Sequence, residues 1–169
     1  MGNINELFNS FIKDIINVFP EYEKRLTKYY KEVIETKEVD KVWIFVKDYI
    51  QQALERSGGY ADHLHIQDQI KKNLMQLWVA WSEQDQKVYA VGVTELKQYP
   101  KYRTMNFRIL TGEKMELWTK FLEPMEVWAK TQGVTKMEFY ARPGWERFLK
   151  GKGYNKTHVQ LDKFLGENK

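Results

Sequence analysis

Cysteine is absent from this sequence of 169 residues. Its absence excludes disulfide bonds, thiolate zinc sites and a cysteine nucleophile. Long apolar runs are absent as well, since no stretch approaches the ~18 apolar residues of a membrane-spanning helix. The N-terminus lacks the charged start and the small-residue cleavage site of a secretory signal. Together these absences predict a cytoplasmic protein with no membrane partner.

Charge of one sign is not concentrated anywhere in the chain. There are 27 Lys and Arg residues against 23 Asp and Glu residues, a net charge of +4, and the two signs are interspersed. Proteins that bind nucleic acid usually carry a clustered basic stripe, so nucleic-acid binding is disfavoured. The P-loop, the dinucleotide-binding glycine motif and the HExxH motif are also missing. His63 and His65 are two residues apart and would diverge on a helix, so no metal site is predicted.

Apolar residues make up 43% of the chain and aromatic residues 15%, as expected of a globular domain with a ring-rich core. Apolar stripes at helical spacing cover residues 4–19 and 22–34, and Pro20 separates them. They predict a helical hairpin in an N-terminal extension of residues 1–38. The hairpin is predicted to pack on the main domain; a homodimer or partner-protein surface is the alternative.

The main domain is predicted to cover residues 39–169. Asp40 and Asp62 are predicted helix N-caps. Gly92 predicts a bulge or a close backbone approach within a strand. Pro124 predicts a kink in its helix, or two shorter helices that meet at Glu123. The predicted elements in chain order are the helices Lys41–Arg56 and Asp62–Met75, the strands Leu77–Ser82, Lys87–Leu96 and Thr104–Leu110, the helix Glu113–Gln132, the strand Val134–Ala141, a short helix from Pro143, and the strand Thr157–Phe164.

Short signature segments accompany this order between residues 42 and 165. They are Leu77-Trp78-Val79-Ala80, Val93-Thr94-Glu95, Tyr99-Pro100, Trp118, Glu126-Val127-Trp128-Ala129, Gly133, Met137-Glu138, Arg142-Pro143-Gly144-Trp145, Leu149 and Gly153-Tyr154. Together they resemble the GNAT N-acetyltransferase superfamily and, more narrowly, the divergent GNAT-like proteins of bacteriophages. The resemblance implies an α/β (α+β) fold with a mixed, mostly antiparallel sheet of five or six strands and helices on both faces.

The resemblance also implies acetyl-CoA as the cofactor. In the family its pantetheine arm lies where the strand matching Thr104–Leu110 splays from the one matching Val134–Ala141, and its pyrophosphate lies at the start of the next helix. The family's loop pattern of one Arg or Gln and two small residues falls here on Glu113, Glu116 and Trp118, none of which matches. The predicted cofactor residues are therefore Leu110, Thr111 and Gly112 in the loop, with Arg142 and Arg147 for the 3′-phosphate of CoA.

The family's catalytic positions are substituted too. Its usual general acid, a tyrosine, corresponds to Leu149, so Tyr154 is the predicted replacement and Tyr140 the alternative. Its usual general base is a glutamate on the strand matching Thr104–Leu110, which has no acidic residue. Glu95 on the preceding strand is the predicted base. A packed ring and a solvated carboxylate are the structural alternatives for Tyr154 and Glu95.

Two functions of different classes follow from the resemblance. The first is an acetyl-CoA-dependent N-acetyltransferase with a divergent cofactor loop that acts on an amine. The second is a non-catalytic GNAT-fold protein that binds another protein through the N-terminal hairpin or the former groove. The fold alone does not decide between them.

Overall fold

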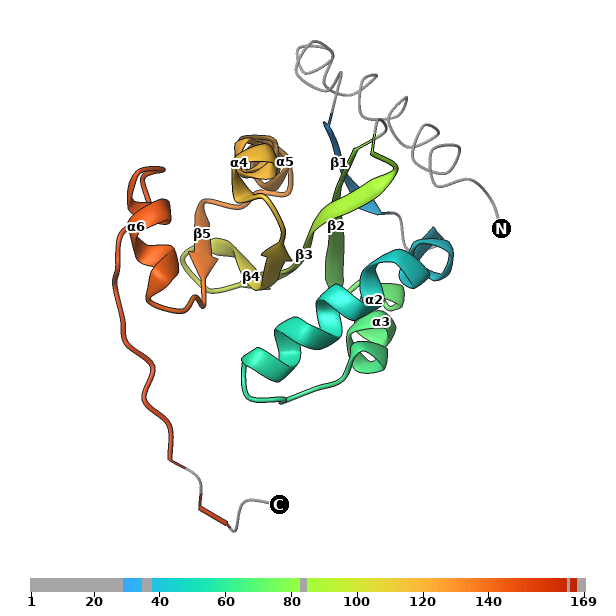
Figure 1. Cartoon of the computed structure of the whole chain (residues 1–169). Coiled ribbons are helices and arrows are strands. Elements are labelled where there is room, and N and C mark those ends of the chain that lie inside the picture. The colour runs from blue at the N-terminus through green and yellow to red at the C-terminus, as the bar shows by residue number, and fades with distance from the viewer. Residues whose placement is uncertain (1–28, 35–37, 83–84, 164, 167–169) are drawn as a thin grey trace. The chain divides into compact units, whose positions relative to one another are not determined.

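The computed structural model describes residues 29–34, 38–82, 85–163 and 165–166. The chain forms two compact units, and the division falls between Phe139 and Tyr140. The first unit contains the sheet and all but one of the helices described below, and the second contains the last helix (Figure 1). Among the helices that the structure describes, none has the length and apolar character needed to cross a lipid bilayer.

The first unit is built on one five-stranded sheet whose strands lie side by side in chain order. The strands are β1 (Tyr29–Ile34), β2 (Met75–Ser82), β3 (Lys87–Gln98), β4 (Arg103–Gly112) and β5 (Lys136–Phe139). Neighbours from β1 to β4 are antiparallel, and β5 is parallel to β4. This arrangement confirms the predicted mixed, mostly antiparallel sheet and the predicted hairpin pairing of Leu77–Ser82 with Lys87–Leu96.

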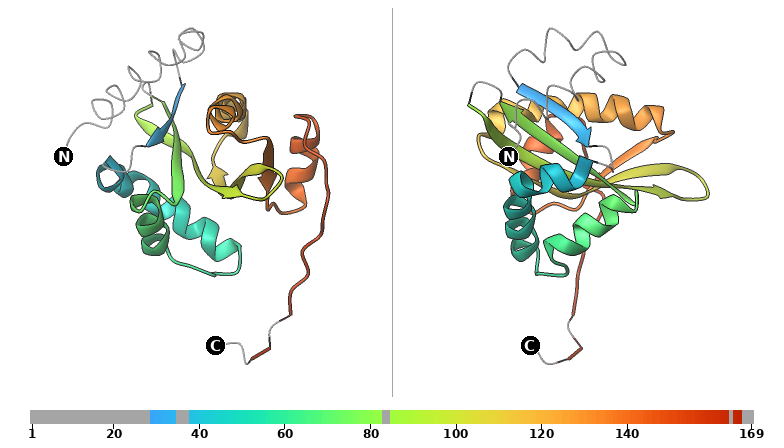
Figure 2. Two further views of the ribbon diagram at one scale, coloured as in Figure 1. Left: turned by 180° about the vertical axis from the view of Figure 1, so that it is seen from behind. Right: turned by 90° about the vertical axis from the view of Figure 1, so that its right-hand side faces the viewer.

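Helices α2 (Val39–Arg56) and α3 (His63–Lys71) cover one face of the sheet, called here the α2–α3 face (Figures 1 and 2). The inward stripe of α2 is fully buried and consists of Val42, Val46, Ile50 and Leu54. These side chains share a core with Leu77, Val79, Trp81, Val91, Val93 and Ile109 of the sheet. Alternate strand residues point to one face, so the helical and strand periodicities meet in one apolar layer.

Of the two predicted N-caps, Asp62 is confirmed and Asp40 is wrong. Asp62 accepts a hydrogen bond from the backbone N–H of His65 at 2.8 Å, which confirms it as the N-cap of α3. Asp40 lies inside the first turn of α2, because that helix begins one residue earlier, at Val39. Its carboxylate instead pairs with Lys71 at 2.9 Å, which joins the two helices.

The opposite, α4–α5 face is covered by α4 (Met115–Trp118), the 3₁₀-helix η3 (Thr119–Phe121) and α5 (Leu122–Thr131). The single stretch predicted as Glu113–Gln132 is thus interrupted, as Pro124 indicated, although the break falls at η3. Pro124 is the third residue of α5, where its missing N–H would have had no intrahelical acceptor. Gly133, at φ 74°, ends α5 in the left-handed conformation that favours glycine.

Two predicted elements were wrong, and a third ends earlier than predicted. Residues 29–34, predicted as helix, form β1; their tyrosines, valine and isoleucine suit a strand, and β2 supplies the partner. The helix predicted over Asp62–Met75 forms as α3, but it ends at Lys71, and Met75 already begins β2. The strand predicted over Thr157–Phe164 does not form in its described part, residues 157–163. Its alternation fits a strand, but a strand also needs ladder hydrogen bonds, and Val159 and Leu161 are 69% and 90% exposed. The rest of the predicted N-terminal hairpin lies outside the described residues.

The second unit contains α6 (Gly144–Lys150), which begins directly after Pro143 as predicted. Its end is a glycine cap: Gly153 has φ 88°, and the N–H of Tyr154 donates to the carbonyl of Leu149 at 3.1 Å. Leu149 is the buried residue of α6.

Candidate functional site

Strand β4 is longer than its partner β5, and the two diverge halfway along. Only residues 104–107 of β4 pair with β5, opposite residues 136–139. Residues 109–112 continue to pair with β3 on the other side. The outer edge of β4 therefore has no β5 partner from Arg108 onward. Backbone donors and acceptors along such an edge can pair with an extended ligand in place of a strand.

A β-bulge at the divergence point changes which residues of β4 share a face. Val93 pairs with Ile109 while Thr94 pairs with Phe107, so β4 advances two residues where β3 advances one. The ring of Phe107 accordingly stacks on that of Phe139, with 4.0 Å between the ring centroids, whereas Ile109 joins the core on the α2–α3 face. Simple alternation would have placed these two residues together. The same shift brings Asn106 onto the α2–α3 face.

Asn106 is fully buried beside two carboxylates. It lies in register with Glu95 of β3 and Glu138 of β5. Neither Oδ1 nor Nδ2 of Asn106 has a hydrogen-bond partner in the structure. Buried polar side chains are nearly always hydrogen-bonded, so an unpartnered amide at a strand divergence marks a candidate ligand site.

Glu95, the predicted general base, lies on this same row. Its carboxylate is 3.6 Å from Lys97 Nζ and 3.9 Å from Arg108 Nε, and its side chain is 26% exposed. Arg108, the bulge residue, also lies over the ring of Tyr60 in the α2–α3 connection, 5.6 Å from its centroid. Glu95 is thus held near two cations at distances that leave its oxygens accessible to a further donor.

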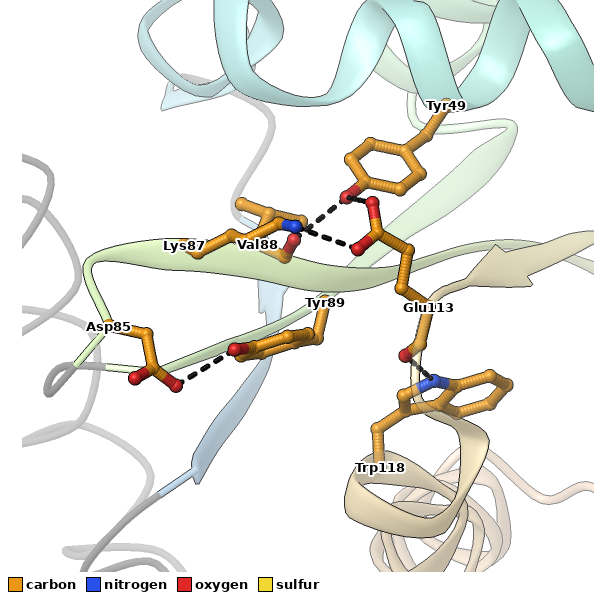
Figure 3. A network of polar contacts seen from close by, with 7 residues as sticks. All are labelled: Tyr49, Asp85, Lys87, Val88, Tyr89, Glu113 and Trp118. Atoms are coloured by element: carbon orange, nitrogen blue, oxygen red, sulfur yellow. Dashed lines mark hydrogen bonds and ion pairs between the residues drawn. The ribbon is translucent and has the colours of Figure 1, made fainter.

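The loop after β4 is fixed by Glu113, as Figure 3 shows. Its carboxylate accepts a hydrogen bond from Lys87 Nζ at 2.7 Å and lies 3.3 Å from the hydroxyl of Tyr49 on α2. Its backbone N–H donates to the carbonyl of Tyr89 at 2.8 Å, and its own carbonyl accepts from Trp118 Nε1 at 2.9 Å. Every polar group of Glu113 is therefore already engaged within the protein.

The charges around Glu113 stabilise one another. The hydrogen bond from Lys87 is the largest cause that lowers the pKa of the Glu113 carboxyl, and the same bond raises the pKa of Lys87. Burial, and then the negative charge of Glu113, raise the pKa of the Tyr49 hydroxyl. All three groups keep their ordinary charge states at neutral pH.

The predicted loop residues Leu110, Thr111 and Gly112 form the free end of β4. A Cβ at Gly112 would collide with the carbonyl of Tyr89 and lie 2.7 Å from Ala90 Cβ. Close packing of β4 on β3 thus already requires glycine at this position. Leu110 turns toward the α4–α5 face and lines a pocket there.

This pocket is apolar and has an empty volume of about 290 Å³, open mouth included. Residues of β2, β3 and β4 line it from the sheet side, and residues of the helical layer line it from the other side. The lining residues are Trp78, Val79, Ala80, Ala90, Gly92, Leu110, Trp118, Phe121, Leu122 and Met125. A Cβ at Gly92 would lie 3.4 Å from that of Trp78, an ordinary contact with a side chain, so the predicted close backbone approach is not seen at this glycine.

The remaining predicted site residues, Arg142, Arg147 and Tyr154, belong to the second unit. Arg142 and Arg147 are exposed, one before α6 and one on it. Tyr154 is partly buried directly after the glycine that ends this helix. Their roles toward a cofactor stay predictions.

Several residues of the site were not among the predicted ones. Asn106 lay within the predicted strand Thr104–Leu110 without a role of its own, and the bulge that gives it buried neighbours has no simple sequence signal. Lys114 was also missed; it adopts φ 50° and its Nζ lies 5.3 Å from the centroid of the Tyr89 ring. Its place two residues after Gly112, in a loop expected to need a cation, was the available signal.

Metal chemistry has no candidate centre in the described part of the chain, where no group of three or more His, Asp and Glu side chains could hold an ion. Nδ1 of His63 instead lies 3.3 Å from Nε1 of Trp43.

No protein-family model matches the sequence, and no curated protein sequence matches it significantly. Solved structures do match. A glucosamine-6-phosphate N-acetyltransferase from Arabidopsis thaliana aligns with a TM-score of 0.58 and 13% identity, over 82% of this chain and 99% of that one. A predicted acetyltransferase with acetyl-CoA from Clostridium acetobutylicum aligns with a TM-score of 0.59 and 14% identity, over 81% and 96%.

A GNAT family acetyltransferase from Staphylococcus aureus aligns with a TM-score of 0.56 and 11% identity, over 82% of this chain and all of that one (100%). At such low identities the likeness concerns the fold. The chain therefore has the fold of the GNAT acetyltransferases.

Proposed function

We propose that this chain is an acetyl-CoA-dependent N-acetyltransferase that acts on an amine in the cytoplasm. The observation that carries the proposal is the divergence of β4 from β5 after Phe107, beside a buried polar row, in a fold whose solved relatives are acetyltransferases. The open edge of β4 would hold the extended arm of the acyl donor through backbone hydrogen bonds. The row of Glu95 and Asn106 on the neighbouring face would receive the amine.

The residues present fit one end of acetyl-CoA better than the other. The free edge at Leu110 and Thr111 suits the pantetheine amides. At the pyrophosphate end, the N–H of Glu113 is already bonded to Tyr89, and its carboxylate would repel phosphate. Lys114 and the amides at the start of α4 are the groups left to neutralise the anion. This mismatch predicts weak rather than absent binding of acetyl-CoA.

The reaction needs a proton acceptor and an oriented amine. Glu95 would take one proton from the substrate ammonium, which frees the nitrogen lone pair. The nitrogen then bonds to the acetyl carbonyl carbon, the carbon–sulfur bond of the thioester breaks, and a second proton passes from nitrogen to the departing thiolate. Most of the acceleration would come from holding amine and thioester in reacting geometry.

Titration of the full chain with acetyl-CoA, followed by thermal unfolding, tests this proposal. Acetyl-CoA at 100 times its dissociation constant should add about 2.7 kcal/mol to the free energy of unfolding. Glu95→Gln should keep that shift and abolish acetyl transfer to amines, whereas Glu55→Gln, at an exposed position of α2, should change neither. No shift at millimolar acetyl-CoA would overturn the proposal.

A second candidate rests on the same loop. Because Glu113 and Trp118 fill the turn where the family binds pyrophosphate, a non-catalytic role as a protein-binding module is the alternative. The narrower likeness to bacteriophage proteins belongs with this alternative. It predicts an intact fold that acetyl-CoA does not stabilise, so the same titration separates the two.

A further inference from the structure

Two adjacent rows of polar residues cross β3, β4 and β5 on the α2–α3 face. The first row contains Glu95, Asn106 and Glu138, and the second contains Lys97, Thr104 and Lys136. Residues two apart on a strand point to the same face, so the rows run parallel, roughly 7 Å apart. One row thus has carboxylates on both sides of its centre, and the other has ammonium groups.

The centre of each row is buried and lacks a partner. Asn106 and Thr104 are both 0% exposed. Oδ1 and Nδ2 of Asn106 and Oγ1 of Thr104 make no hydrogen bond in the structure. Unmet polar groups of this kind are rare in folded proteins and call for a ligand or ordered water.

The exposed fraction of the flanking side chains runs from 20% for Glu138 to 44% for Lys136, and they already pair along the strands. Lys136 Nζ lies 2.8 Å from Glu138 Oε1, and Lys97 Nζ lies 3.6 Å from Glu95 Oε2. Ion pairs on a sheet surface are common and contribute little, which is the simplest interpretation of the flanks. That interpretation leaves the two buried, unpartnered centres unexplained.

The charges of the cluster restrict what could bind. Two carboxylates face three cations, because Arg108 also approaches Glu95. A doubly positive ligand would add to an excess of positive charge, and a doubly negative ligand would face the glutamate row. A ligand with one charge of each sign complements both rows.

We propose that the two rows bind a zwitterionic amine of dipeptide size, and this assignment rests on the proposed acetyltransferase function, since that amine would be the acetyl acceptor. Its ammonium group would lie between Glu95 and Glu138 and donate to Oδ1 of Asn106. Its carboxylate would lie between Lys97 and Lys136 and accept from the hydroxyl of Thr104. Two extended residues span about 7 Å, which matches the separation of the rows.

Calorimetric titration of the full chain at low salt tests the assignment, with glycylglycine as the zwitterionic probe. 1,4-Diaminobutane, succinate and N-acetylglycylglycine are the matched probes with two positive charges, two negative charges and a blocked amine. Glycylglycine should bind at least tenfold more tightly than each of the other three. Equal binding of all four probes, or tighter binding of the diamine, would overturn the assignment.

Variants locate the site. Lys136→Gln and Glu138→Gln lie at partly exposed positions and should each weaken glycylglycine binding about tenfold, the loss expected for one charge-assisted hydrogen bond. Lys156→Gln and Glu146→Gln remove a comparable surface ion pair elsewhere and should have no effect. Asn106→Leu should abolish binding while leaving the melting temperature equal or higher, because it removes two unmet polar groups. A purely structural asparagine would give the opposite result.

Acetyl-CoA binding, measured in parallel, separates the two proposals. If acetyl-CoA stabilises the protein and glycylglycine does not bind, the zwitterion assignment fails and the acetyltransferase proposal stands. If glycylglycine binds at the rows but acetyl-CoA gives no shift, the acetyltransferase proposal fails and the rows remain a binding site for a zwitterion.

Discussion

The α2–α3 face of the sheet is closed by a mostly aliphatic core that also includes Trp43 and Trp81, whereas residues of the α4–α5 face line a pocket. Ala80, Ala90 and Gly92 lie beneath Trp118 and Phe121 there, and the fit leaves a pocket. Close packing in the first layer stabilises the fold, and the second layer leaves space. The α2–α3 face also carries the polar rows, so the proposed amine site lies on the same face as this core.

The largest expected effect tests the aliphatic layer. Ile50→Ala removes a fully buried side chain from the centre of α2 and should lower the free energy of unfolding by about 2–5 kcal/mol. Ile44→Ala, on the same helix but 52% exposed, should change it by less than about 0.5 kcal/mol. Chemical denaturation of both variants measures the difference. Equal losses would mean that α2 does not bury the face described here.

A smaller effect is expected where β4 leads into the α4–α5 face. Gly112→Ala places a methyl group against the backbone of Tyr89 and Ala90, so the end of β4 must move away from β3. The expected cost is about 1–3 kcal/mol, as for other overpacked sites. Gly144→Ala, whose Cβ would meet nothing within 4 Å, is the matched control and should be neutral or slightly stabilising. If the two variants unfold at the same denaturant concentration, β4 does not approach β3 this closely.

The two faces also differ in how far the sequence predicted them. The stripe of α2 and the hairpin of β2 and β3 follow from local periodicity, which is what helices and strands impose on a sequence. The helix break near Pro124 was also predictable, because proline acts on its own turn. The sequence showed that the loop departs from the family pattern at Glu113, Glu116 and Trp118. It did not show that the Glu113 carboxylate binds Lys87 and Tyr49.

The polar rows could not be predicted, because they depend on register. One bulge at Arg108 decides whether Asn106 faces α2 or α5, and alternation alone does not reveal a bulge. The wrongly predicted strand, in its described residues 157–163, also reflects a feature that local sequence does not show. Its alternation resembles that of β4, but pairing requires a neighbour that local sequence does not specify. Contacts such as Lys87 with Glu113, 26 residues apart, lie beyond any local pattern.

Glu113 connects the two faces, and its removal should have the smallest effect. The carboxylate touches Tyr49 on the α2–α3 side, and the carbonyl of the same residue holds Trp118 on the other (Figure 3). Because its pKa is lowered in the folded state, Glu113 stabilises the protein above its ordinary pKa of 4.5. That contribution is lost as the pH falls through the lowered folded value.

Melting temperatures of the wild type and of Glu113→Gln, measured from pH 7 to pH 3, test this link. The wild type should melt slightly higher near neutral pH, and the two curves should converge below pH 4.5, since the amide cannot titrate. The control is Glu55→Gln, at an exposed position of α2, and its melting temperatures should follow those of the wild type throughout. Asp68→Gln is unsuitable as a control, because the pKa of Asp68 is lowered as well. If the curves of wild type and Glu113→Gln stay parallel across this range, the carboxylate does not join the faces, and the loop is held by Trp118 and the Tyr89 carbonyl alone.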